Sequence, residues 1–140
     1  MKPLPTLQVT AMRQATLSRN LAKPAFKYSH VVKVGPHYYF SGLLAQDRQT
    51  GAMVGETVGA QAATILANAQ VLMLEYGLGF EHLAIARIFT TEMDKFSEIN
   101  AAWEQVFNNI PHAPPARTSI GVAALPLQGR VEIEFTFYKE

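Results

Sequence analysis

Arg117 is the residue of this chain best placed to bind a small anion, because of what stands on either side of it. Pro114 and Pro115 restrict the backbone just before it, and an apolar run, 120–125, follows it. An arginine held in this way can grip a carboxylate through two parallel hydrogen bonds. A second run, 131–137, carries glutamates at alternate positions, and a glutamate near the arginine could handle a proton or a water molecule. The spacing suggests a site for a small anionic molecule.

The same residues also allow a purely structural interpretation. Glu132 and Glu134 lie two positions apart, so they share one face of an expected strand, and the apolar residues that alternate with them share the other. Such alternation is normal for a half-exposed strand. Arg117 would then pair with Glu132 or Glu134 across neighbouring strands. The residues alone leave both interpretations open, and structural ion pairs are the commoner arrangement.

Three further residues could line such a site. Ser41 offers a hydroxyl group at the end of an expected strand, and Gly42 allows a ligand to approach the backbone closely. Tyr28 could present its phenol to a polar substrate. A strand-ending turn at Ser41-Gly42 and a half-buried packing role for Tyr28 explain the same residues without a ligand.

Several kinds of site lack their usual sequence signal. The chain has no cysteine, which excludes thiol nucleophiles and cysteine-bound metals. His30, His37, His82 and His112 fall in four different segments and form no close metal-binding pair. The glycine patterns that cradle nucleotide phosphates are also missing. We therefore expect neither a metal nor a cofactor.

Charge and hydropathy restrict the expected partners. The formal net charge is +1, with no basic block, which argues against a nucleic-acid partner. No apolar run approaches the roughly 20 residues of a membrane span, and we expect no membrane partner. The lack of cysteine fits a reducing compartment, so the expected location is cytoplasmic.

The elements that must position the candidate residues follow from hydrophobic periodicity. The sequence predicts strands at 31–34 and 37–41, a helix at 56–76, a strand at 83–91, a helix with Asp94 as its N-cap, and strands in the runs 120–125 and 131–137. This order, β-β-α-β-α-β-β, predicts an α+β two-layer sandwich with two helices on one face of a mixed β-sheet. The 140 residues suit a single domain, placed at 23–140 after an N-terminal extension at 1–22.

The face of the sheet away from the helices is expected to be apolar. Phe135 and Phe137 are assigned to it, together with other apolar groups. A small domain rarely leaves such a face in water, which favours oligomerisation through the sheet.

These residues give the chain a resemblance to the RidA/YjgF family, the reactive-intermediate (enamine/imine) deaminases, which are also described as endoribonuclease L-PSP-like. The resemblance runs from about residue 23 to the C-terminus. Its matching stretches are Tyr28-Ser29, Val32-Lys33-Val34-Gly35, Phe40-Ser41-Gly42, Asp47 with Thr50-Gly51, Gln61, Phe96 with Asn100, Pro115-Ala116-Arg117-Thr118 and Val131-Glu132-Ile133-Glu134.

The resemblance implies a chorismate-mutase-like α+β fold and a homotrimer with sites between its subunits. It implies hydrolysis of enamines such as 2-aminoacrylate, through their imines, to 2-keto acids and ammonia without a cofactor. In such a site Arg117 would hold the substrate carboxylate and Glu132 would position or activate the attacking water. Tyr28, Ser41 and Gly42 would line the pocket, and Ser119, where many members have cysteine, would contact the substrate through its backbone.

Other outcomes stay open within the same family. The chain departs from the best-known deaminases at Leu43-Leu44-Ala45, Gly121 and Ala124, which line or border the implied pocket. A non-catalytic trimer that binds a metabolite or acts as a chaperone is one alternative. An endoribonuclease or translation inhibitor is another, although the near-neutral charge argues against it.

Overall fold

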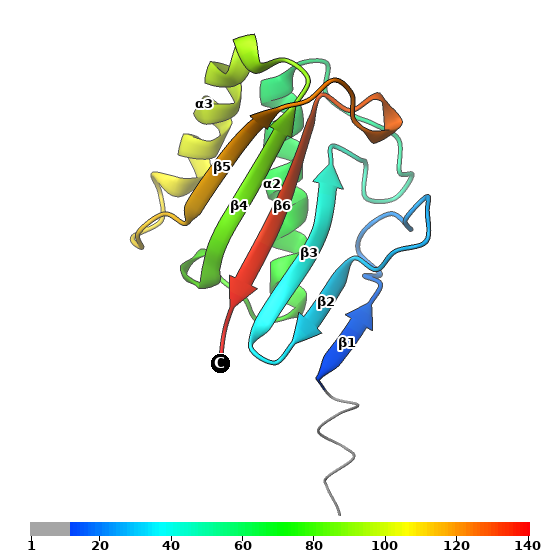
Figure 1. Ribbon diagram of the computed structural model, residues 1–140, viewed down its shortest axis with the longest axis vertical. Coiled ribbons are helices and arrows are strands. Elements are labelled where there is room, and N and C mark those ends of the chain that lie inside the picture. Colours follow the sequence, from blue (N-terminus) through cyan, green and yellow to red (C-terminus); the bar gives the residue numbers. More distant parts are fainter. Residues whose placement is uncertain (1–11) are drawn as a thin grey trace, which may run out of the picture.

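One mixed β-sheet with two helices on one side makes up the structure, a computed structural model that describes residues 12–140 (Figure 1). Its elements are β1 (Arg13–Thr16), β2 (Val31–Val34), β3 (His37–Leu44), α2 (Val58–Glu75), β4 (Leu83–Thr90), α3 (Phe96–Phe107), β5 (Ala116–Gly121) and β6 (Val131–Tyr138). The strand order is β1-β2-β3-β6-β4-β5. Within residues 12–140, only β4 and β5 are parallel neighbours, and the other pairs are antiparallel. The predicted α+β sandwich is confirmed.

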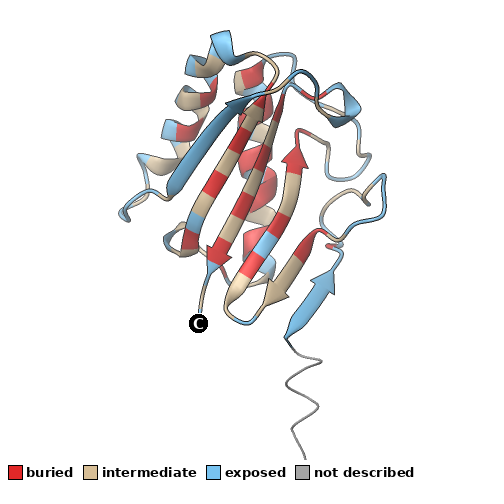
Figure 2. Ribbon diagram, viewed as in Figure 1, coloured by how far each residue is buried: buried red, intermediate tan, exposed pale blue. Residues whose placement is uncertain are grey.

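The core lies between the sheet and the helices, and it corrects one prediction. Phe135 and Phe137 have no exposed surface and pack with α2 residues such as Ile65 and Leu72. They therefore face the helices, and the prediction that they lie on the opposite face of the sheet is wrong. The alternation of β6 places Glu132 and Glu134 on that opposite side, where both are only partly buried (Figure 2).

Strand β1 was not predicted. It lies inside the expected extension 1–22 and pairs antiparallel with β2 at the edge of the sheet. All four of its residues are exposed, so its sequence carries no apolar alternation that could reveal it. Residues 1–11 of the expected extension lie outside the described residues.

The segment after β1 is attached to the domain through His30, which is buried. The backbone N–H of Ser18 donates to His30 Nδ1 at 2.8 Å, and His30 Nε2 lies 3.0 Å from the carbonyl oxygen of Ala22. Since Nδ1 accepts, Nε2 carries the proton and donates. Residues 18–22 are thereby fixed beside β2 and β3.

Helix α2 stabilises the loop after β3 and the loop before β6 through two buried amide side chains. Gln61 Oε1 accepts from the backbone N–H of Arg130 at 2.9 Å, and Gln61 Nε2 donates to the carbonyl of Gly55 at 3.0 Å. Asn68 Nδ2 donates to the carbonyl of Gln46 at 2.9 Å. The loop before β6 and the loop after β3 are thus bound to the same helix.

Two boundaries differ from the predictions for local reasons. Helix α3 begins at Phe96, because a 3-10 turn, Met93–Lys95, precedes it, so Asp94 is not its N-cap. Strand β5 begins at Ala116 and ends at Gly121, earlier than the apolar run suggested. No helix in the range 12–140 combines the length and the hydropathy that a membrane span requires.

Replacing Gln61 tests how much the buried amide contributes. Gln61→Ala leaves the backbone N–H of Arg130 and the carbonyl of Gly55 without their partners, and we expect a loss of about 1–3 kcal/mol in the free energy of unfolding. Urea denaturation measures it. The control is Gln105→Ala on the exposed side of α3, expected within about 0.5 kcal/mol of wild type. Equal losses in the two variants would show that the amide bonds contribute nothing.

Candidate active site

A cavity of about 310 Å³ lies beside Glu132, on the side of β6 that faces away from the helices. Residues of strands β3 and β6, the segment 25–28 and the turn at 126–127 line it, and it is open to the surface. Its lining residues are Ala25, Phe26, Tyr28, Ser41, Gly42, Leu44, Gln46, Pro126, Leu127, Glu132 and Glu134. Four of the predicted site residues, Tyr28, Ser41, Gly42 and Glu132, therefore meet in one place.

Gly42 is required because the side chain of Glu132 packs onto its backbone. A Cβ atom at position 42 would lie 2.9 Å from Glu132 Cδ, closer than side chains normally approach. The prediction that Gly42 ends a strand is wrong. Gly42 lies within β3, at an irregularity where the register with β6 shifts between Phe40 and Leu43. Such a bulge redirects the neighbouring side chains. The glycine therefore gives room to a protein carboxyl group.

The position of Glu132 changes its acidity. Burial raises the pKa of its carboxyl group, and the neighbouring charge of Glu134 raises it further. Tyr28, on the other side of the cavity, has its phenol pKa raised by burial and then by Glu132. At neutral pH Tyr28 is thus a hydrogen-bond donor, and Glu132 is a stronger base than an exposed glutamate.

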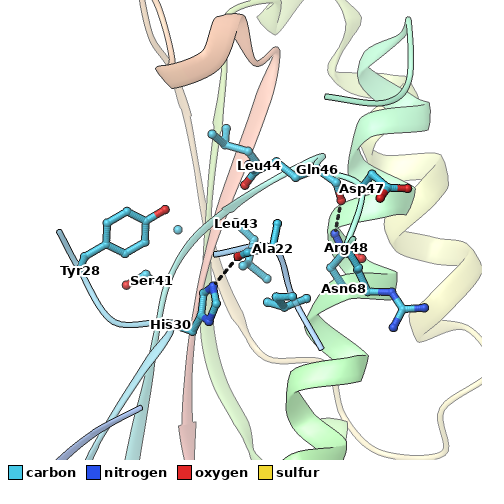
Figure 3. Close-up of a pocket in the computed structure, with 12 residues that line it drawn as sticks. Ala22, Tyr28, His30, Ser41, Leu43, Leu44, Gln46, Asp47, Arg48 and Asn68 are labelled. Carbon is cyan, nitrogen blue, oxygen red and sulfur yellow. Dashed lines mark hydrogen bonds between the residues drawn. The ribbon is translucent and has the colours of Figure 1, made fainter. Parts of the chain in front are cut away.

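Ser41 holds the segment that carries Tyr28. Its hydroxyl group donates to the carbonyl of Ser29 at 2.6 Å, and its backbone N–H donates to the carbonyl of His30 at 3.0 Å. Figure 3 shows Tyr28, Ser41 and His30 in a neighbouring pocket that shares Tyr28 and Ser41 with this cavity, with His30 bonded to Ala22. The proton of the Ser41 hydroxyl is therefore already engaged, and lone pairs on its oxygen are left for a ligand.

Arg117 and Ser119 lie elsewhere in the chain. Strand β5 pairs with β4, which separates it from β6. Arg117 stands opposite Ala86, and Ala86 stands opposite Phe135, so Arg117 shares the helix-facing side of the sheet. Ser119, two residues on, shares that side too. A single chain does not bring Arg117 to Glu132.

The ion pair that seemed the commoner interpretation of Arg117 is wrong. Its strand is not a neighbour of β6, and within residues 12–140 Arg117 forms no ion pair with any carboxylate. Its guanidinium carbon lies 5.5 Å from the ring centre of Phe96 and 5.2 Å from that of Trp103. It lines a separate hollow of about 500 Å³ between α3 and β5.

The apolar rim of the Glu132 cavity was not predicted from the sequence. Phe26 is 70% exposed and Leu127 is 42% exposed, and both line the cavity beside Pro126. Leu127 has a φ of 55°, in the left-handed region that leucine seldom adopts. A proline followed by leucine gives no signal of this conformation.

In the part of the chain that the structure describes, no group of three or more suitable side chains is arranged to hold a metal ion.

Comparison with known proteins shows the family to which the chain belongs. The family model for Endoribonuclease L-PSP matches residues 18–138. The chain belongs to this family, which is the RidA/YjgF family. The match begins within the segment that His30 attaches to the sheet and ends with β6.

Relatives of similar length carry several different names. A RutC family protein of Aquifex aeolicus is 34% identical over 116 residues, which is 83% of this chain and 91% of the relative. Protein DfrA of Myxococcus xanthus is 34% identical over 124 residues, 87% of this chain and 92% of that protein. A protein of Bos taurus named 2-iminobutanoate/2-iminopropanoate deaminase is 35% identical over 107 residues, 76% of each chain.

Solved structures share the fold. RidA from Psychrobacter sp. PAMC 21119 has a TM-score of 0.81 at 30% identity, over 91% of this chain and 100% of its own. A putative endoribonuclease from Thermotoga maritima has a TM-score of 0.83 at 29% identity, over 92% of this chain and 99% of its own.

The raised pKa of Glu132 predicts a titration above the ordinary value of 4.5. Because the folded-state pKa is raised, ionisation of Glu132 opposes folding, and the free energy of unfolding falls as pH rises through that pKa. Glu132→Gln should therefore stabilise the protein more at about pH 8 than at about pH 4. Carboxyl ¹³C shifts locate the midpoint directly, and Glu134→Gln should lower it only in part, since burial is the larger cause. A midpoint at or below 4.5 would contradict this account of the cavity.

Gly42→Ala should displace the Glu132 carboxyl group from β3 into a more exposed position. We expect its titration midpoint to move back toward the ordinary value, because burial is the main cause of the shift. Gly121→Ala is the matched control, since a Cβ there would lie 3.6 Å from Met93, an ordinary contact. The same midpoint in Gly42→Ala as in wild type would show that the glycine does not position Glu132.

Proposed function

We propose that the protein is a hydrolytic deaminase of 2-imino acids and the enamines that give rise to them, and that its active site forms between two copies of the chain. The observation that carries the proposal is the arrangement of the two charged groups. Glu132 is half-buried at a cavity with its pKa raised, and Arg117 stands without an acidic partner in the range 12–140 on an exposed edge strand. Each supplies half of a site, and they are on opposite sides of one chain.

A second copy supplies the missing half in this proposal. All six residues of β5 are exposed, so the strand that bears Arg117 is open to a neighbour (Figure 2). The cavity at Glu132 is also open, with an apolar rim that a partner could cover. Closed rings of identical subunits repeat one such contact at every interface. A homotrimer with three equivalent sites is the form that we propose.

The chemistry requires orientation more than a strong nucleophile. The carbon of a C=N bond is already electrophilic, and a nearby carboxylate on the substrate gives the protein a handle. Arg117 of one copy binds that carboxylate through paired hydrogen bonds. The imine carbon is then held over the Glu132 cavity of the neighbouring copy.

Glu132 moves the proton in the reaction. Its carboxylate takes a proton from a water molecule as the oxygen of that water bonds to the imine carbon. The proton returns to the nitrogen and gives a neutral tetrahedral adduct. Glu132 then passes the proton of the new hydroxyl group to the same nitrogen, the C–N bond breaks, and ammonia leaves as the C=O bond of the 2-keto acid forms. The net change is one imine and one water to one keto acid and one ammonia, and Glu132 ends as it began. Tyr28 donates a hydrogen bond within the same cavity.

One relative supports this choice of reaction. The protein of Bos taurus that is 35% identical to this chain is named as a deaminase of 2-iminobutanoate and 2-iminopropanoate. Cleavage of RNA has less support in this chain, because its net charge is +1 and its lysines and arginines form no basic block.

Arg117→Ala should abolish most of the activity without changing the subunit number. Two hydrogen bonds to a charged group contribute roughly 3 kcal/mol together, so kcat/KM should fall about a hundredfold. An amino acid oxidase generates the 2-imino acid in situ, and ammonia and keto acid are measured above the uncatalysed rate. Arg117→Lys keeps the charge but not the fork and should fall between the two.

Arg130→Ala is the control for this experiment, because Arg130 is exposed and pairs with Glu92 at 3.4 Å. It should retain wild-type activity. Wild-type rates in Arg117→Ala would overturn the proposed role of Arg117. A wild-type protein that binds 2-keto acids but accelerates no hydrolysis would show a binding protein instead.

A further inference from the structure

We propose that Phe96 and Trp103 are positioning residues for Arg117, and that they fix its guanidinium group without neutralising it. We call these two side chains the aromatic shelf. The inference rests on the proposed function in one respect, because it takes the group that Arg117 binds to be a substrate carboxylate. It adds two residues to the site that touch the arginine and not the reacting atoms.

The shelf belongs to α3, which lies against β5 on the helix-covered side of the sheet (Figure 1). Phe96 and Trp103 are seven residues apart, so two helical turns bring their rings to the same side of α3. The guanidinium carbon of Arg117 is 5.5 Å from one ring centre and 5.2 Å from the other. Both distances are within the range of a cation–π interaction.

The Trp103 ring is held in place by its contact with a neighbouring aromatic ring. It is only 7% exposed, and it stacks on Phe107 with ring centres 4.3 Å apart and planes at 24°. Phe107 in turn contacts Phe80 edge-on at 4.9 Å. These ring contacts fix the position of the Trp103 indole. A fixed ring face beside the guanidinium group of Arg117 restricts the orientation of the guanidinium plane.

An aromatic support differs from an acidic one in what it leaves to the ligand. A ring face attracts the cation but accepts none of its N–H bonds in the way a carboxylate does, so the five donors of the guanidinium stay available. Arg130 shows the other arrangement, since it is paired with Glu92 at 3.4 Å. Glu104 lines the same hollow as Arg117 and forms no ion pair with it.

The shelf matters because β5 constrains the arginine side chain little. In the part of the chain that the structure describes, the strand lies at the edge of the sheet and pairs only with β4, and all six of its positions are exposed. Pro114 and Pro115 restrict the backbone before the strand, but this restriction does not determine the rotamer of the Arg117 side chain. The rings of α3 are therefore what directs the long side chain of Arg117.

The test measures ligand binding and turnover in three aromatic variants. Trp103→Leu removes the larger ring, and we expect KM for the 2-imino acid and Kd for pyruvate, the probe, each to rise about 3- to 10-fold, with kcat within about twofold. Trp103→Phe restores a ring and should recover most of the loss. Phe137→Leu is the control: it removes a fully buried ring from the core between the sheet and α2, outside the line of rings that supports Trp103, so it should lower Tm and leave KM and Kd unchanged.

A second arm asks whether Trp103 acts through Arg117. In the Arg117→Ala background, Trp103→Leu should cause no further rise in the Kd for pyruvate measured by calorimetry, because nothing remains to be positioned. Equal rises in both backgrounds would overturn the proposal, as would a Trp103→Leu enzyme with unchanged KM and Kd. Binding of pyruvate without turnover would contradict the proposed function and still test the shelf, whereas a wild-type protein that neither binds nor turns over would contradict both.

Discussion

The alternation of side chains across one sheet is the constraint on which the rest of the structure depends. On β6 it directs the four fully buried apolar residues toward the helices, and this leaves Glu132 and Glu134 on the other side. On β5 the same rule places Arg117 with the buried side, over the rings of α3. The hydrophobic core therefore requires that the acid and the arginine face in opposite directions. In the function that we propose, a second copy of the chain resolves that separation.

The burial of the ionised Glu132 carboxylate lowers the stability of the folded protein, and hydrogen bonds between other residues maintain the shape of the cavity. Keeping a carboxylate half-buried beside another is unfavourable, as the raised pKa of Glu132 expresses. The walls around it are held by bonds that do not involve the acid. Gln61 and Asn68 fix the loops from the helix side, and Ser41 fastens the segment of Tyr28 to β3. These hydrogen bonds can keep Glu132 in its unfavourable, partly buried position at the cavity.

The sequence predicted the elements well and their relations in space less well. Periodicity locates most strands and both helices, but it says only which residues share a face and not which face the helices cover, so Phe135 and Phe137 were assigned to the wrong side. Chain order also differs from sheet order: β4 lies between β5 and β6, so Arg117 and Glu132 are neither neighbours nor an ion pair. Strand β1 and the strained turn at Leu127 gave no signal, because one is wholly exposed and the other is a backbone conformation set by its surroundings. The cluster of Tyr28, Ser41, Gly42 and Glu132, in contrast, was predictable from the residues and the family resemblance together.

The central claim is that each active site takes Arg117 from one copy and Glu132 from another, and mixing inactive subunits tests it most directly. Arg117→Ala and Glu132→Gln chains are unfolded together, refolded at equal amounts, and compared with each variant and with wild type treated in the same way. The account predicts that the mixture regains about a quarter of the wild-type rate, because each half of a site is intact in half of the copies. A mixture as inactive as its two components, with refolded wild type active, would contradict a site shared between chains.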